Sequence, residues 1–64
     1  MPWVTINILA GTSVEKKKKL HTEVATAIQN ALDIPLEHVR IHLVEMADDD
    51  HSIGGIGIRE ILNQ

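Results

Sequence analysis

Residues 1–10 read MPWVTINILA and carry the pattern around which the rest of the chain is organised. In residues 3–9 every second side chain is apolar and β-branched, and the positions between them are more polar, apart from the tryptophan that opens the run. A period of two residues is typical of a β-strand with one apolar face. We therefore predict a strand over residues 3–9, ended by the Ala-Gly pair that follows it.

The next segment predicts a long amphipathic helix from Val14 to about Leu32. Its apolar residues recur three or four positions apart, without the alternation of a strand. Two caps compete at its start, because Thr12 with Glu15 fits the capping box and Ser13 is an alternative cap. The apolar positions are Leu20, Val24, Ala27, Ile28 and Ala31.

A second strand is predicted over residues 39–46, VRIHLVEM, after Pro35 has ended the helix and residues 36–38 have formed one short turn. One face of this strand carries Val39 and Ile41, and the other carries Arg40. Strand, helix and strand in this order predict a βαβ unit with two parallel strands and a right-handed crossover.

The last part of the chain predicts a small hairpin. Ile53 and Ile56 flank Gly54 and Gly55, and a Gly-Gly pair permits the positive φ angles of a tight turn. Residues 59–64 are predicted to form a short tail, either a strand or one helical turn. The fold class is thus small α/β, with residues 1–64 as a single domain.

The length of the chain predicts an oligomer. Sixty-four residues bury a smaller fraction of their surface than a typical domain does, so the core needs a supplement. The sequence has no cysteine, which excludes disulfides and thiolate metal sites. With 44% hydrophobic residues the chain is globular, and association with further copies is the remaining way to stabilise it.

Charge and hydropathy exclude several classes of partner. A net charge of −3 and a pI of about 5.7 argue against a nucleic-acid binder, and the lysines at 16–19 cover most of a helix circumference rather than one stripe. No apolar run approaches the roughly 20 residues of a membrane span, and residues 1–10 lack the basic start of a signal peptide. We expect a cytoplasmic protein with no nucleic-acid or membrane partner.

Pro2 is the first candidate catalytic residue. If Met1 is removed, Pro2 becomes the terminus and supplies a secondary amine. Model α-amino groups titrate near about pH 8, and burial beside cations lowers that pKa toward the range of a general base. The alternative is that a proline at position 2 only delays the start of the strand.

Arg40 is the second candidate, because a guanidinium within a strand needs a carboxylate partner or an anionic ligand unless that face of the sheet is open to water. The structural alternative is an ion pair across a subunit contact, with Glu45 or an aspartate of the acidic loop at 48–50. His38 and His42 have a metal-like spacing, but in a strand they lie roughly 13 Å apart. An EF-hand loop starting at Asp48 would need a glycine at its sixth position, where the chain has Ile53, so we expect no metal and no cofactor.

Several of these features together resemble the tautomerase superfamily, and its 4-oxalocrotonate tautomerase subgroup in particular. They are Pro2 after an initiator Met, the βαβ unit, Arg40 early in the second strand, the EMA segment at 45–47 and the IGG turn at 53–55. The resemblance implies that Pro2 moves a proton between a carbon and another atom of an enol or conjugated ketone. It also implies that Arg40 binds a substrate carboxylate or carbonyl, often from a neighbouring subunit, in a homohexamer built as a trimer of dimers.

The sequence departs from that family pattern at two positions. Thr12 stands where well-studied members carry a second arginine, and His51 stands where they carry an aromatic residue. Both are candidate substrate-binding residues, and the alternative for His51 is a surface histidine in the acidic loop. The lost guanidinium predicts a monocarboxylate substrate, such as an arylpyruvate enol, or a poor, promiscuous activity on the dicarboxylate. The alternatives are a hydratase or dehalogenase on the same scaffold, or a family member with weak activity and a structural or binding role.

Overall fold

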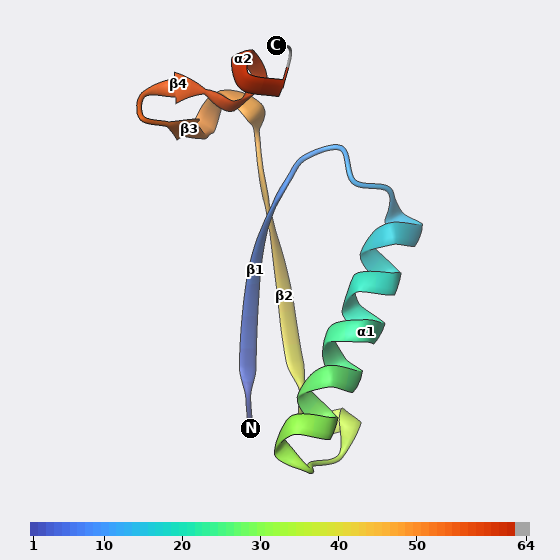
Figure 1. Cartoon of the computed structure of the whole chain (residues 1–64). Helices are drawn as coiled ribbons and strands as arrows, with labels where there is room; N and C mark the ends of the chain where they lie inside the picture. The colour runs from blue at the N-terminus through green and yellow to red at the C-terminus, as the bar shows by residue number, and fades with distance from the viewer. Residues whose placement is uncertain (63–64) are drawn as a thin grey trace.

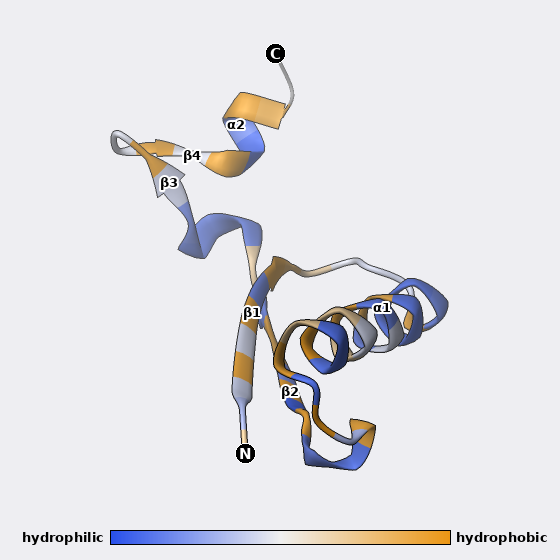
Figure 2. Ribbon diagram, turned by 60° about the horizontal axis from the view of Figure 1, so that its bottom comes forward, coloured by the Kyte–Doolittle hydropathy of each residue, from blue (hydrophilic) through white to orange (hydrophobic). Residues whose placement is uncertain are grey.

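The βαβ unit predicted from the sequence is present in the computed structural model, which describes residues 1–62 (Figure 1). Strand β1 (Trp3–Leu9) and strand β2 (Arg40–Met46) are parallel neighbours, in register from Trp3 opposite Arg40 to Leu9 opposite Met46. Helix α1 (Val14–Leu32) connects them and lies along one side of the sheet (Figures 1 and 2). The predicted bounds of the first strand and the helix are confirmed.

The helix ends are formed by local hydrogen bonds. Ser13 is the N-cap, and its hydroxyl oxygen accepts from the backbone N–H of Lys16 at 3.2 Å. The alternative cap, Thr12, donates its own hydroxyl to the carbonyl of Leu9 at 3.4 Å instead. At the other end, Asp33 adopts the left-handed conformation, with φ of 55°, ahead of the proline predicted to stop the helix.

The second strand is one residue shorter than predicted. Residues Leu36–His38 form the 3-10 turn η1, and the N–H of Val39 closes it by donating to the carbonyl of Leu36 at 3.0 Å. That bond keeps Val39 outside the ladder, so β2 begins at Arg40.

A small C-terminal unit follows the sheet and projects away from it (Figure 1). It consists of the 3-10 turn η2 (Asp48–Asp50), the hairpin strands β3 (Ser52–Ile53) and β4 (Ile56–Gly57), and helix α2 (Ile58–Leu62). The predicted hairpin is confirmed, with Gly54 and Gly55 at φ of 62° and 86° in its turn. The tail forms the helical turn, and the last two residues of the predicted tail lie outside the described range.

The isolated chain lacks an enclosed core. Throughout residues 1–62 no side chain is buried, and apolar residues such as Trp3 and Leu62 stay 76% and 64% exposed. The accessible surface is 4990 Å², whereas a globular protein of 7.1 kDa exposes about 4,100 Å². The radius of gyration is 14.9 Å, against about 11 Å for a compact chain of this length. One copy therefore leaves the apolar surface of its sheet, helix and hairpin without cover.

Candidate active site

Pro2 and Arg40 meet at one end of the sheet. Both strands begin there because they are parallel, and the backbone N–H of Arg40 donates to the carbonyl oxygen of Pro2 at 3.2 Å. The two residues that the sequence singled out are thus joined through their backbones.

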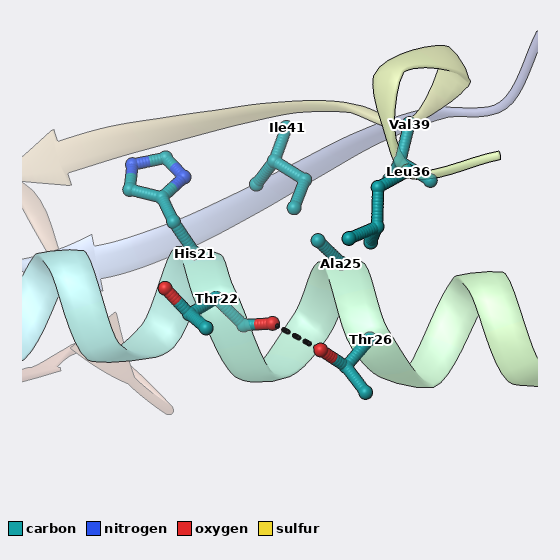
Figure 3. Close-up of a pocket in the computed structure, with 7 residues that line it drawn as sticks. All are labelled: His21, Thr22, Ala25, Thr26, Leu36, Val39 and Ile41. Carbon is teal, nitrogen blue, oxygen red and sulfur yellow. Dashed lines mark hydrogen bonds between the residues drawn. The ribbon is translucent and has the colours of Figure 1, made fainter.

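Their side chains lie on different faces of the sheet. Exposure alternates from Met1 onward, with Pro2 and Val4 half-buried and Trp3 exposed. Because Trp3 pairs with Arg40 in register, the arginine shares the exposed face of Trp3 rather than the side of Pro2. We call the face that carries Trp3 and Arg40 the outward face, because the other face carries Ile41 toward helix α1 (Figure 3).

Arg40 lies at a hollow of about 380 Å³ around the start of both strands. Its guanidinium carbon is 5.5 Å from the centre of the Trp3 ring, within the range of a cation–π contact. The lining residues are Trp3, Val4, Thr5, Glu37, Val39, Arg40, Ile41 and His42.

Within one chain, Glu45 and Asp48 pair with other cations and not with Arg40. Glu45 forms an ion pair with Lys17 of helix α1, and Asp48 accepts from Nε of Arg59 at 3.5 Å. Across residues 1–62 Arg40 makes no ion pair, which leaves its donors available to an anion. The alternative, an ion pair between Arg40 and a carboxylate of another subunit, concerns a contact that a single chain does not contain.

Thr12 and His51 lie at the opposite end of the sheet from Pro2. Thr12 follows the end of β1, and His51 follows the end of β2 and the turn η2. Seven residues of strand span roughly 20 Å. A single chain therefore brings Pro2 close to Arg40 and does not bring Thr12 or His51 to either of them.

A second hollow, of about 450 Å³, lies between helix α1 and the start of β2 (Figure 3). Its wall is largely apolar, with His21 at one end and Leu36 at the other. The hydroxyl of Thr26 is already used, because it donates to the carbonyl of Thr22 at 2.9 Å. This hollow faces the helix and does not include Pro2 or Arg40.

Sequence reasoning placed His42 on the same strand face as Arg40 but missed the part of Trp3 in the hollow at Arg40. Trp3 drew attention only as the one aromatic residue of the chain. The usable signal was its position, because Trp3 opens the first strand and Arg40 opens the strand that pairs with it. In the part of the chain that the structure describes, no cluster of three His, Cys, Asp or Glu side chains could hold a metal ion. No helix there is long and apolar enough to cross a membrane.

Comparison with known proteins identifies the family. Residues 2–61 match the model of the tautomerase family, described as "Tautomerase enzyme". A 2-hydroxymuconate tautomerase of Pseudomonas putida is 47% identical over 55 residues, which are 86% of this chain and 87% of that protein. A second 2-hydroxymuconate tautomerase, from Stutzerimonas stutzeri, is 43% identical over 95% of this chain and 97% of its own length.

The solved structures agree with the sequence relatives. The heterohexamer 4-oxalocrotonate tautomerase of Chloroflexus aurantiacus superposes with a TM-score of 0.90 at 33% identity, covering 95% of this chain and 98% of that one. The chain therefore belongs to the tautomerase family, and it is an isomerase of the keto–enol type. Within the superfamily it is a member of the 4-oxalocrotonate tautomerase-like branch, as the resemblance indicated.

Proposed function

We propose that the chain, once Met1 is removed, interconverts the enol and keto forms of a small 2-oxo carboxylate, with Pro2 as the general base and acid. The neutral amine of Pro2 takes one proton from the substrate and returns it at another atom, so that only one hydrogen and one double bond change place. Arg40 binds the carboxylate or carbonyl. The observation that carries the proposal is the family match, which spans residues 2–61 and so begins at Pro2.

Two properties of Arg40 support its role. It makes no ion pair within residues 1–62, and its cation lies at the end of the sheet where the Pro2 backbone also lies. A cation beside the terminal amine disfavours its protonated form, so an Arg40 supplied by a neighbouring copy would lower the pKa of the Pro2 amine and raise the fraction of neutral base.

The active site is proposed to need more than one copy of the chain. Thr12 and His51 are separated from Pro2 by the length of the strands, and the side chain of Arg40 lies on the other face of the sheet. A neighbouring copy whose sheet runs in the opposite direction beside Pro2 can supply Thr12 and His51, and Arg40 then comes from a further copy. We propose a homohexamer built as a trimer of dimers.

The substrate is proposed to be a monocarboxylate such as an arylpyruvate enol. Thr12 offers a hydroxyl where a dicarboxylate would need a second cation, which costs one charge-assisted hydrogen bond of about 1.5–3 kcal/mol. His51 makes the site wetter than an aromatic residue would, and its imidazole can donate to the substrate.

Replacing Arg40 with alanine is expected to raise KM for carboxylate substrates by roughly tenfold to a hundredfold, with a smaller change in kcat. The measurement is ketonisation of phenylenolpyruvate and of 2-hydroxymuconate, followed by ultraviolet absorbance. Wild-type protein should show the lower KM for phenylenolpyruvate.

The rising limb of kcat/KM against pH should move to higher pH in Arg40→Ala, because loss of the cation raises the pKa of the Pro2 amine. Arg59→Ala is the matched control, since Arg59 pairs with Asp48 at the other end of the sheet. An unchanged KM in Arg40→Ala would remove Arg40 from the binding role.

Sedimentation at micromolar concentration is expected to show no folded monomer. The physical reason is the absence of buried side chains in residues 1–62 together with a surface larger than that of a compact chain. Analytical ultracentrifugation with circular dichroism on the same samples measures mass and helix content together. A monomeric species that keeps its helix signal on dilution would contradict the oligomer.

A further inference from the structure

Trp3 has no packing role that explains its size within one chain. Its side chain is 76% exposed at the very start of β1, although tryptophan is the largest apolar side chain. The fold does not require an aromatic residue there, because the same face continues with the small polar side chains of Thr5 and Asn7. A large exposed apolar surface is typical of a contact between copies or of a ligand site, and the arginine cation against the Trp3 ring favours a ligand site.

Trp3 and Arg40 lie in contact with each other on the outward face. They are opposite each other in register, and the guanidinium lies over the indole ring at 5.5 Å. The contact limits the directions in which the guanidinium can turn, while its outer N–H groups stay free to donate. A carboxylate bound there lies beside the indole, so the rest of the ligand extends along an aromatic surface.

The remaining walls of the hollow define the ligand further. Its volume of about 380 Å³ is within the range of small-molecule sites, roughly 300–1,000 Å³. Glu37 lines the same hollow and adds a negative charge, which disfavours a second carboxylate on the ligand. His42 and Thr5 supply further polar groups near the middle of the strands.

We infer that Trp3 is the specificity residue of the site at Arg40, and that it selects monocarboxylates bearing a planar apolar group over those bearing an alkyl chain. The inference rests on the proposed function for the role of Arg40. An aromatic ring stacks on the indole in an offset or edge-on arrangement and gains more than an alkyl chain of similar area.

Ligand binding can be followed directly, because Trp3 is the only Trp and the chain has no Tyr or Phe. Titration with 3-phenylpropionate is expected to change the intrinsic fluorescence, and hexanoate should bind roughly two- to tenfold more weakly. The Pro2→Ala variant should bind 3-phenylpropionate as the wild type does, although its turnover is lost. Saturation by 3-phenylpropionate without any fluorescence change, or equal affinity for the two acids, would overturn the inference.

Kinetics of Trp3 variants separate specificity from folding. Trp3→Leu is expected to raise KM roughly two- to tenfold for phenylenolpyruvate and less than about twofold for an alkyl enolpyruvate, whereas Trp3→Phe restores the difference. Leu32→Ala, at an exposed apolar position on helix α1, is the control and should leave both KM values unchanged. Equal changes for the two substrates would reduce Trp3 to a structural residue. If the protein binds 3-phenylpropionate more tightly than hexanoate but turns over neither enol substrate, the proposed function is wrong and the role of Trp3 in ligand selection remains supported.

Discussion

Pro2→Ala is expected to lower kcat for enol-to-keto conversion by at least about a hundredfold, while the melting temperature stays within a few degrees of the wild type. Alanine leaves a primary amine at the terminus, which rotates freely and lacks the ring that fixes the direction of the proline lone pair. The fold loses little, because the carbonyl that accepts from Arg40 at 3.2 Å is present in either residue.

The matched control is Pro35→Ala, because Pro2 and Pro35 are the two prolines of the chain. Pro35 precedes the turn η1 and makes no side-chain cap hydrogen bond. Its replacement gives the unfolded chain more conformational freedom, so it should affect stability and leave kcat unchanged. Activity is measured with phenylenolpyruvate and stability by circular dichroism. Equal losses of activity and stability in Pro2→Ala would make Pro2 a folding residue.

Intact mass belongs with this measurement. With Met1 attached, the nitrogen of Pro2 is an amide and has no basic lone pair, whatever surrounds it. Specific activity is therefore expected to follow the fraction of chains that have lost Met1, which methionine aminopeptidases remove before small residues such as proline. Full activity in chains that retain Met1 would contradict catalysis by the Pro2 amine.

The sequence predicts the βαβ unit well because each element has its own local signal. Alternation of period two defines β1 and β2, and spacing of three or four defines α1, so their bounds agree with the prediction to within one residue. The exceptions have local causes. Val39 is held outside β2 by a turn bond to Leu36, and Ser13 takes the cap position that Thr12 could also have taken.

The candidate site is less predictable, since it depends on contacts between residues far apart in the sequence. The sequence offered Glu45 as a partner of Arg40 across a subunit contact, and nothing in it indicated that Glu45 pairs with Lys17 of the helix in its own chain. The cation–π contact of Arg40 with Trp3 requires the strand register, which periodicity alone does not give. The separation of Thr12 from Pro2 likewise follows from the parallel direction of the strands and the distance between their ends.

The placement of Pro2 and Arg40 on different faces of the sheet leads to a test by mixing inactive variants. If Arg40 serves the Pro2 of a neighbouring copy, Pro2→Ala and Arg40→Ala are complementary defects. An Arg40→Ala chain still supplies Pro2, and a Pro2→Ala chain still supplies Arg40. Random assembly of an equal mixture would then give about one quarter of the sites both native residues, while each variant alone has none.

The two variants are unfolded in guanidinium chloride, mixed in equal amounts and refolded together, and native mass spectrometry verifies that mixed assemblies form. We expect activity well above that of either variant refolded alone, approaching about one quarter of refolded wild type. The positive control is Pro2→Ala mixed with Pro35→Ala, because the Pro35→Ala chains keep both Pro2 and Arg40. The expectation follows from the faces of the sheet, because Pro2 shares the half-buried side with Val4, whereas Arg40 pairs with Trp3 on the outward face. A mixture no more active than its components would mean that Pro2 and Arg40 of the same chain act together, with the Arg40 side chain reaching around the end of the sheet.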